Sequence, residues 1–315
     1  GTPIIHVLHP SSHSVIECLM NHVLTLVAPK GKLTAAIVAE AIAVLNNSGA
    51  AVDDRTWLAN GEALDIAFNG SEPHTVESDL RRAFSDMRVD LFAGPSQGRR
   101  KRLLLADMDA TIVTSETLDE LAARMGLKDQ VAAITARAMN GELNFEVALK
   151  ERVAILNGLT ETALAETYAA TQMSPGAVVL VRTMRAHGAY CVLVSGGFTY
   201  FTSRIAQACG FHENQGNRLG IFNKTLTGRV LEPILGKDAK LAMLNRLIAE
   251  RGLATTETAA IGDGANDIPM LQAAGLGVAY QAKPVVTDAA QARIDHTDLR
   301  TLLFFQGYKN SEFAS

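Results

Sequence analysis

The alternation of apolar and polar positions predicts two parts of the chain with different folds. The first part has six segments with the period of a strand or a helix, in the order strand 23–28, helix 32–46, strands 53–59 and 63–68, helix 75–87 and strand 89–93. Asn60-Gly61, a dipeptide typical of a hairpin turn, separates the two central strands. This β-α-β-β-α-β order predicts an α+β domain of ferredoxin-like topology over residues 20–95.

After residue 100, strands and helices alternate. We expect strands at 103–106, 190–194, 258–261 and 276–279, alternating with helices at 199–209, 238–251 and 268–274. Four further helical segments, at 117–126, 129–140, 144–156 and 160–171, stand together between the first two strands. Strands that alternate with helices predict a parallel sheet covered on both faces, and the active sites of such sheets lie beyond the carboxyl ends of the strands.

Composition and charge exclude several classes of protein. The 315 residues are 48% hydrophobic and 20% charged, which indicates a folded globular chain. A net charge of −4 and an aromatic content of 5% argue against a protein that binds nucleic acid through phosphate contacts or base stacking. Residues 1–95 carry a net charge of −5 and the remainder +1. Between them, the turn-rich stretch 94–98 precedes the basic run 99–102, which we interpret as the solvated edge of a linker.

The cysteines and the hydropathy of the chain indicate the cellular compartment of the protein. The three cysteines, Cys18, Cys191 and Cys209, are odd in number and form no C-x-x-C pair, so we expect neither a zinc site nor a disulfide framework. No apolar stretch reaches the roughly 18 residues of a membrane span, and no basic region precedes an apolar core at the start. These features predict a cytoplasmic protein with no membrane partner.

Two carboxylates directly follow the strand predicted at 103–106. In Asp107-Met108-Asp109-Ala110-Thr111 they stand two residues apart, so both can point at one site beyond the end of the strand. One carboxylate could attack an electrophile while the other moves protons. The alternative interpretation of this stretch is an acidic turn.

Two further strands also end in polar residues and glycines. Ser195-Gly196-Gly197 offers a hydroxyl and free backbone N–H groups at the start of a helix, which suits an anion, although a tight turn would have the same sequence. Gly262-Asp263-Gly264-Ala265-Asn266-Asp267 offers two carboxylates four residues apart, which suit Mg²⁺, although Asp267 could simply cap a helix. Lys240, early in a helix, could be a cationic partner of the site or a solvated charge.

Together, and in this order, the motifs resemble the haloacid dehalogenase superfamily of phosphohydrolases. With Glu116, Asn144-Phe145-Glu146 and Arg152, they resemble its phosphoserine phosphatase family. The resemblance implies a Rossmann-like parallel sheet core over 100–116 and 175–310 with an inserted helical-bundle cap over 117–174. One departure is Ala110, where close relatives often carry Ser. The first 95 residues resemble an ACT-type regulatory domain, but their first turn is Pro29-Lys30-Gly31-Lys32, where an acidic residue is usual.

The resemblance also implies a role for each residue of the motifs. Asp107 is expected to be the nucleophile and to form an aspartyl-phosphate, and Asp109 the general acid and base. Mg²⁺ would be held by Asp107, the backbone carbonyl of Asp109 and Asp263. Phosphoryl oxygens would be held by Ser195, the Gly196 N–H and Lys240. Asn266 and Asp267 would support that shell, or Asp267 would bind a metal-bound water. In the cap, Glu116 would meet an ammonium, Arg152 a carboxylate, and Met139 and Phe145 would form an apolar wall.

The implied reaction is the Mg²⁺-dependent hydrolysis of O-phosphoserine to serine and phosphate, the last step of serine biosynthesis. One alternative is a related phosphatase or phosphotransferase acting on another small phosphomonoester. Another is an amino-acid-sensing regulatory protein whose phosphatase half is inert. For the N-terminal domain we expect assembly into a homodimer or a response to serine as an effector.

Overall fold

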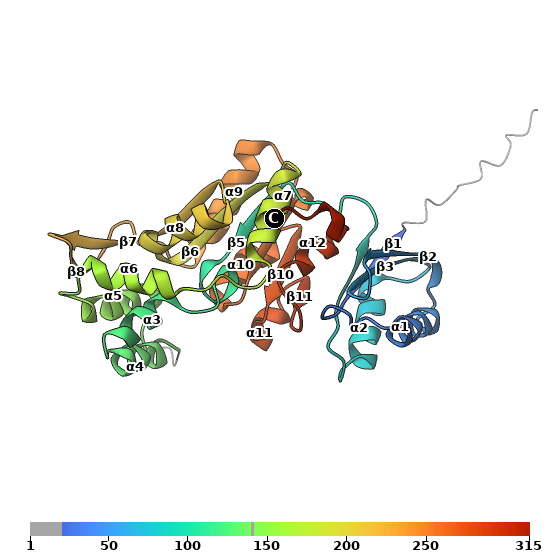
Figure 1. The fold of residues 1–315 in the computed structure, drawn as a ribbon, viewed down its shortest axis with the longest axis horizontal. Helices are drawn as coiled ribbons and strands as arrows, with labels where there is room; N and C mark the ends of the chain where they lie inside the picture. Colours follow the sequence, from blue (N-terminus) through green and yellow to red (C-terminus); the bar gives the residue numbers. More distant parts are fainter. Residues whose placement is uncertain (1–20, 140–141) are drawn as a thin grey trace, which may run out of the picture.

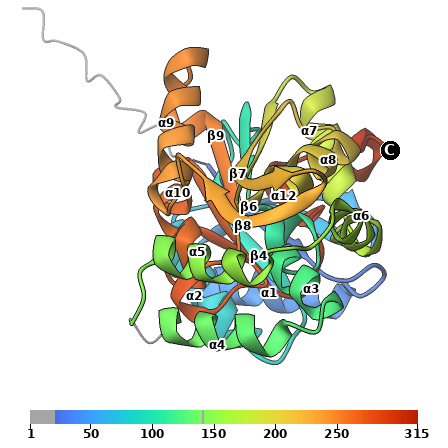
Figure 2. The same ribbon diagram turned by 90° about the vertical axis from the view of Figure 1, so that its left-hand side faces the viewer.

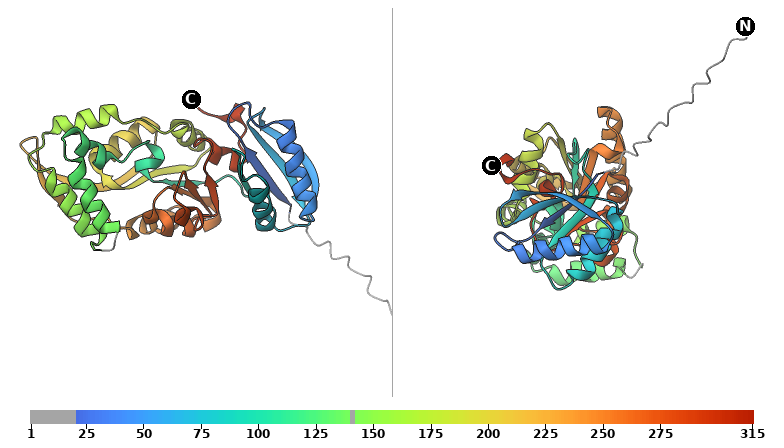
Figure 3. Two further views of the ribbon diagram at one scale, coloured as in Figure 1. Left: turned by 90° about the horizontal axis from the view of Figure 1, so that it is seen from below. Right: turned by 90° about the vertical axis from the view of Figure 1, so that its right-hand side faces the viewer.

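The computed structural model describes residues 21–139 and 142–315, so Cys18 lies outside the described residues. The described chain forms two sheets (Figure 1). One has four strands in the order β2-β3-β1-β4, and the other has seven in the order β11-β10-β9-β5-β6-β7-β8. The part that holds the first sheet lies at one end of an elongated molecule (Figures 1 and 3).

The N-terminal α+β domain has the predicted order of elements. It consists of β1 (His22–Val27), α1 (Ala35–Asn47), β2 (Ala51–Ala59), β3 (Ala63–Asn69), α2 (Pro73–Ala83) and β4 (Asp90–Pro95). All its strand pairs are antiparallel. Successive side chains of a strand point to opposite faces, and Leu24 and Leu26 of β1 pack with both helices in one core. Thr25, between them, faces the opposite side, where it meets the rest of the chain.

The second sheet is mostly parallel. Its strands are β5 (Leu103–Ala106), β6 (Tyr190–Phe198), β7 (Glu213–Phe222), β8 (Thr225–Leu231), β9 (Thr258–Gly262), β10 (Leu276–Tyr280) and β11 (Ala292–Ile294). The helices of this part are α7 (Ala177–Ala186), α8 (Thr199–Cys209), α9 (Asp238–Arg251), α10 (Ile268–Ala273), α11 (Pro284–Thr287) and α12 (Thr301–Phe305). The antiparallel hairpin β7–β8 makes the sheet mixed, which the sequence did not indicate. Its turn, Asn223-Lys224, lacks the glycine that usually marks such a turn, and both residues adopt positive φ.

Four helices between β5 and β6 form the cap. They are α3 (Thr117–Arg124), α4 (Lys128–Met139), α5 (Phe145–Ile155) and α6 (Glu161–Ala170). Together with the β7–β8 hairpin, they form the end of the molecule opposite the N-terminal domain (Figure 2). The chain enters and leaves the cap side by side, since Val113 pairs with Met173 in an antiparallel bridge and the Thr114 N–H donates to the Gln172 carbonyl at 3.0 Å. Among the described helices, none combines the length and the apolar character that crossing a bilayer demands.

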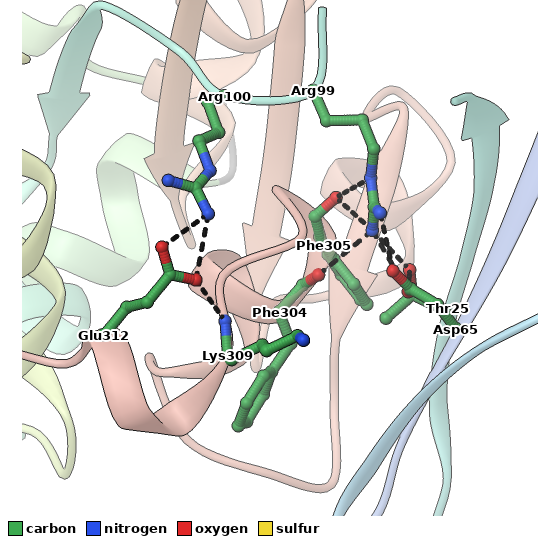
Figure 4. Close-up of polar contacts among 8 residues, drawn as sticks. All are labelled: Thr25, Asp65, Arg99, Arg100, Phe304, Phe305, Lys309 and Glu312. Carbon is green, nitrogen blue, oxygen red and sulfur yellow. Dashed lines mark hydrogen bonds and ion pairs between the residues drawn. The ribbon is translucent and has the colours of Figure 1, made fainter. Parts of the chain in front are cut away.

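The basic run after the N-terminal domain is only in part the solvated linker edge that we expected, since Arg100 and Arg102 are exposed but Arg99 is not. The Arg99 side chain is only 14% exposed and donates to both Asp65 oxygens at 2.6 and 3.1 Å (Figure 4). It also donates to the Thr25 hydroxyl and to the Phe304 and Phe305 carbonyls at 2.9–3.3 Å. For Arg99 the prediction was wrong, because its acceptors come from distant segments, which a local charge pattern does not show.

Candidate active site

The ends of three neighbouring strands build the site. In the sheet, β5 lies between β6 and β9, and the parallel register sets Ala106 beside Leu193 and Ile261. Parallel strands bring their carboxyl ends to one edge, so the residues that follow these positions gather there. This edge borders a cavity of about 140 Å³. Its lining consists of Asp107, Asp109, Glu116, Leu118, Phe145, Leu149, Arg152, Ser195, Gly196, Gly197, Phe198, Asp263, Gly264 and Asn266.

Nine of the residues singled out in the sequence therefore line one cavity, and Lys240 and Asp267 are buried beside it. Lys240 lines an adjoining small cavity together with Ser195, Gly196 and Asn266. Asp267 is fully buried. Met139 is the last residue of α4, and its side chain lies outside the described part of the chain.

Asp107 is a buried carboxylate held by a buried lysine. The Lys240 ammonium donates to Asp107 Oδ1 at 2.6 Å and to Asp267 Oδ1 at 2.5 Å. Burial opposes the charged form of Lys240, but the two carboxylates outweigh it and raise its pKa above the ordinary value. The pKa of Asp107 is also raised, by burial and by repulsion from Asp267 and Asp263, which exceed the attraction of one lysine. The cluster of three carboxylates (Asp107, Asp263 and Asp267) and one lysine therefore has an excess of negative charge.

The oxygens of three carboxylates, Asp107, Asp263 and Asp267, lie within 4.8 Å of one another. They are not equally free to bind a cation. Asp267 Oδ2 accepts the N–H groups of Asp263 and Gly264 at 3.1 and 3.0 Å, and its Oδ1 accepts from Lys240. Asp263 uses Oδ1 to accept the Thr111 hydroxyl at 2.8 Å. Among the described residues, these bonds leave Oδ2 of Asp107 and of Asp263 without a hydrogen bond, whereas both oxygens of Asp267 are engaged in holding the loop. Hard oxygen donors beside excess negative charge fit a divalent metal.

Asp109 is oriented by the chain that leads into the cap. Its Oδ1 accepts the N–H of Thr117, the first residue of α3, at 3.0 Å. Burial raises the pKa of Asp109 to about 6. The backbone turns sharply after it, and Ala110 adopts φ +52°, a left-handed conformation that disfavours a residue with a Cβ. Asp109 is thus a carboxyl group that can hold or release a proton near neutral pH.

The glycines after Ser195 let the two catalytic strands approach each other. The N–H of Gly197 donates to Ser195 Oγ at 2.8 Å, which fixes the hydroxyl. A Cβ on Gly197 would lie 2.9 Å from Asp109 Oδ2 and 3.0 Å from Ser195 Oγ, closer than ordinary packing permits.

Gly197→Ala is therefore expected to lower kcat by about 10-fold to 10²-fold, because it displaces both side chains by a fraction of an ångström. Phosphate release at saturating substrate measures the effect, and the melting temperature shows whether the fold is retained. Gly188→Ala is the control for a general loss of stability, since Gly188 precedes β6 at the end of the strand remote from Ser195, has a positive φ, and a Cβ there would meet nothing within 4 Å. Full activity of the Gly197 variant would contradict the assigned approach.

The cap contributes a guanidinium and an aromatic ring to the cavity, and Glu116, the residue before the first cap helix, contributes a carboxylate. Burial, aided by repulsion from Asp109, raises the pKa of Glu116 to about 7, and Arg152 partly counters this. Arg152 is not paired with Glu151, which instead binds Arg137 at 3.0 Å. The Phe145 ring lies 3.5 Å from the position that a Cβ of Gly196 would take, so the cap touches the core at the site.

Two buried residues contribute to the site although sequence reasoning gave them no role. Thr111 belongs to the first motif, and its spacing from Asp107 was the available signal. Asn217 on β7, only 1% exposed, donates to the Gly196 carbonyl at 2.8 Å and accepts the Leu235 N–H at 2.8 Å. It ties the Ser195 turn to the loop before α9, and no local motif marks it.

Comparison with known proteins agrees with this geometry. A model of the haloacid dehalogenase-like hydrolase family matches residues 104–272. The chain is 38% identical over 284 residues to the phosphoserine phosphatase of Streptomyces coelicolor, with 89% of this chain and 69% of that protein covered. Phosphoserine phosphatases of Archaeoglobus fulgidus and Mycobacterium tuberculosis are 39% and 42% identical. The chain spans 66% and 53% of their lengths.

Solved structures show the same fold. A probable phosphoserine phosphatase from Vibrio cholerae, in unliganded form, is 30% identical with a TM-score of 0.76, over 93% of this chain and 88% of that one. A substrate-bound phosphoserine phosphatase complex is 35% identical with a TM-score of 0.61, over 65% of this chain and 97% of that one. The chain therefore belongs to the haloacid dehalogenase-like hydrolases and, among them, to the phosphoserine phosphatase family.

Proposed function

We propose that the protein hydrolyses O-phosphoserine to serine and phosphate through an aspartyl-phosphate on Asp107. One observation carries the proposal. A single cavity is lined by the Asp107 carboxylate and the Ser195 turn, and also by Glu116, just before the cap, and Arg152 of the cap. The first pair suits a phosphoryl group, and the second suits the ammonium and carboxylate of an amino acid. Family membership supports the same assignment.

The residues of the core supply each part of the transfer. An Asp107 oxygen attacks phosphorus while Ser195, the Gly196 N–H and Lys240 hold the phosphoryl oxygens. Asp109, with its pKa raised to about 6 by burial, gives its proton to the departing serine oxygen. The same carboxylate then takes a proton from the water that hydrolyses the aspartyl-phosphate. Asn266 and Asp267 keep the residues around the phosphoryl group in place.

We infer that the cation of the site is Mg²⁺, held by Asp107, the Asp109 carbonyl and Asp263. When bound, it would neutralise charge on the phosphoryl group and on the facing carboxylates. The shortage of positive charge around Asp107 and the free Oδ2 atoms of Asp107 and Asp263 support this set.

Removing divalent cations is expected to stop the reaction. Free phosphate released from a panel of phosphomonoesters, with EDTA and with Mg²⁺ restored, tests both the cation and the substrate. We expect O-phosphoserine to be hydrolysed fastest and EDTA to abolish its turnover reversibly. Equal turnover with and without EDTA would rule out the metal, and a preference for another phosphomonoester would favour the alternative phosphatase or phosphotransferase.

For the N-terminal domain we propose assembly into a homodimer or a response to serine as an effector. The outer strand β2 and α1 border a cavity of about 540 Å³ that includes Trp57, which is 42% exposed, and Arg55. An apolar recess beside a sheet edge supports contact with another chain or a small ligand. Sedimentation velocity with and without L-serine distinguishes these roles.

We place the activity in the cytoplasm. Cys191 and Cys209 are free and buried, and burial raises the pKa of their thiols to about 12 and about 11. Unreactive free thiols support a reducing compartment.

A further inference from the structure

A clamp joins the N-terminal domain to one loop of the catalytic core. The clamp is the Asp90 carboxylate at the start of β4, which is only 2% exposed. Its two oxygens accept the N–H groups of Asp295, His296 and Thr297 at 2.8–3.2 Å and the Thr297 hydroxyl at 2.6 Å. Because N–H and O–H donors fill both oxygens, this carboxylate serves the loop and is not available to a metal.

A second carboxylate of the N-terminal domain holds the other end of the same loop, residues 295–300. Glu62, also buried, accepts from Arg300 at 2.7 Å, and Arg300 in turn binds Asp298 at 2.8 Å. Removing one partner of a buried ion pair destabilises the folded state, because the remaining charge is left buried without a counterion. The conformation of the loop therefore depends on two residues from a different domain.

The opposite side of this loop supports the segment by which the chain returns from the cap. The Leu299 N–H donates to the Pro175 carbonyl at 3.1 Å. Gly176 packs so closely on the loop that a Cβ would lie 2.7 Å from Asp298 Oδ1 and 2.8 Å from the Arg300 nitrogen. The loop thus lies between the N-terminal domain and residues 173–176, the segment by which the chain leaves the cap. We call this segment the cap hinge.

The hinge also touches the first catalytic motif. The N–H of Ser174 donates to the Ile112 carbonyl at 2.8 Å, and Ser174 is buried. Ile112 follows Thr111, whose hydroxyl holds Asp263. The path from Asp90 to the segment that leaves the cap therefore runs through hydrogen bonds, packing contacts and covalent neighbours, all among described residues.

We propose that Asp90 is a positioning residue for the phosphatase reaction, acting through the 295–300 loop on the cap hinge. It holds the segment that leaves the cap, so that Arg152 of the cap and Glu116 just before it stay where they line the cavity. The kinetic consequence of this inference rests on the proposed function. The contacts from Asp90 to the cap hinge do not depend on it. A cap held less firmly keeps these two side chains in place for a smaller fraction of the time, so the apparent affinity for the substrate falls in proportion.

The test compares Asp90→Asn and Asp90→Ala with Asp86→Asn, an exposed aspartate of the same domain. Asp90→Asn should raise KM for O-phosphoserine about fivefold, and Asp90→Ala more. Turnover of an aryl phosphate, which has no ammonium or carboxylate for the cap to grip, should stay within about twofold. A purely structural role would lower the melting temperature and leave this KM difference absent.

Hydrogen exchange gives a readout that needs no substrate. In the Asp90 variants, the Leu299 and Ser174 amides should exchange at least about tenfold faster, while those of β5 and β6 keep their wild-type protection. Thr297→Val removes one hydroxyl and should move the same amides less, which keeps the test valid if Asp90→Ala does not fold. Unchanged exchange at Leu299 and Ser174 overturns the proposal. If wild-type protein does not hydrolyse O-phosphoserine, the proposed function fails, and exchange alone decides the role of Asp90.

Discussion

Asp107→Asn is expected to reduce phosphate release from O-phosphoserine at least about 10⁴-fold, because an amide oxygen cannot form the covalent intermediate. Release of inorganic phosphate at saturating substrate and Mg²⁺ measures the loss. Asp86→Asn, the same change at an exposed position, should retain wild-type turnover. A residual activity above about one thousandth of wild type would mean that another group attacks phosphorus.

The same variant makes a prediction about stability with the opposite sign. The pKa of Asp107 is raised, mainly by burial and by Asp267, so its ionised form is disfavoured in the folded protein. A carboxyl group whose folded pKa is raised destabilises the folded state at pH values above its unfolded pKa. Without metal at neutral pH, Asp107→Asn should therefore melt at or above the wild-type temperature. A lower melting temperature would show that the ion pair of Asp107 with Lys240 stabilises the fold by more than burial and repulsion from Asp267 and Asp263 destabilise it.

Arg152→Ala is expected to separate the proposed substrate from other phosphomonoesters. A guanidinium that grips a carboxylate with two N–H groups contributes about 3 kcal/mol, so kcat/KM for O-phosphoserine should fall about 10²-fold. An aryl phosphate has no carboxylate at that position and should lose less than about threefold.

The control for Arg152 is another arginine of the cap. Arg137→Ala removes a side chain that is 47% exposed and bound to Glu151 and Glu142 on the surface. It should change neither substrate measurably, since exposed ion pairs contribute little. If Arg152→Ala lowers kcat/KM equally for both substrates, this arginine supports the cap but does not bind the carboxylate of the substrate.

The family and the two-sheet fold could be predicted because the relevant signals are local in the sequence. Asp107, Ser195 and Asp263 each stand directly after or at the end of an apolar strand, and parallel strands bring such ends to one edge. The comparisons confirm the family, and the topology confirms the two-sheet fold. The residue roles stay predictions, now with the supporting fact that one cavity gathers most of them.

What could not be predicted depends on residues far apart in the chain. Arg99 finds its acceptors at Asp65 and Phe305, and Asn217 links two loops that no motif connects. The β7–β8 hairpin has weak alternation and a turn without glycine, so its strands have no clear local signature. In these places tertiary contacts, and not propensity, decide the structure.

The buried guanidinium of Arg99 has a consequence for dividing the protein into separately expressed pieces. A cut at the break before it would leave Arg99 on the catalytic piece without Asp65 and Thr25, so that its guanidinium would be exposed to water. The same cut would uncover the Phe305 ring, which packs 5.5 Å from that of Phe92. The composition of the chain changes at this break, but the molecule does not come apart there. An expressed catalytic piece would present this apolar ring to water, and a polar residue at 305 is expected to improve its solubility.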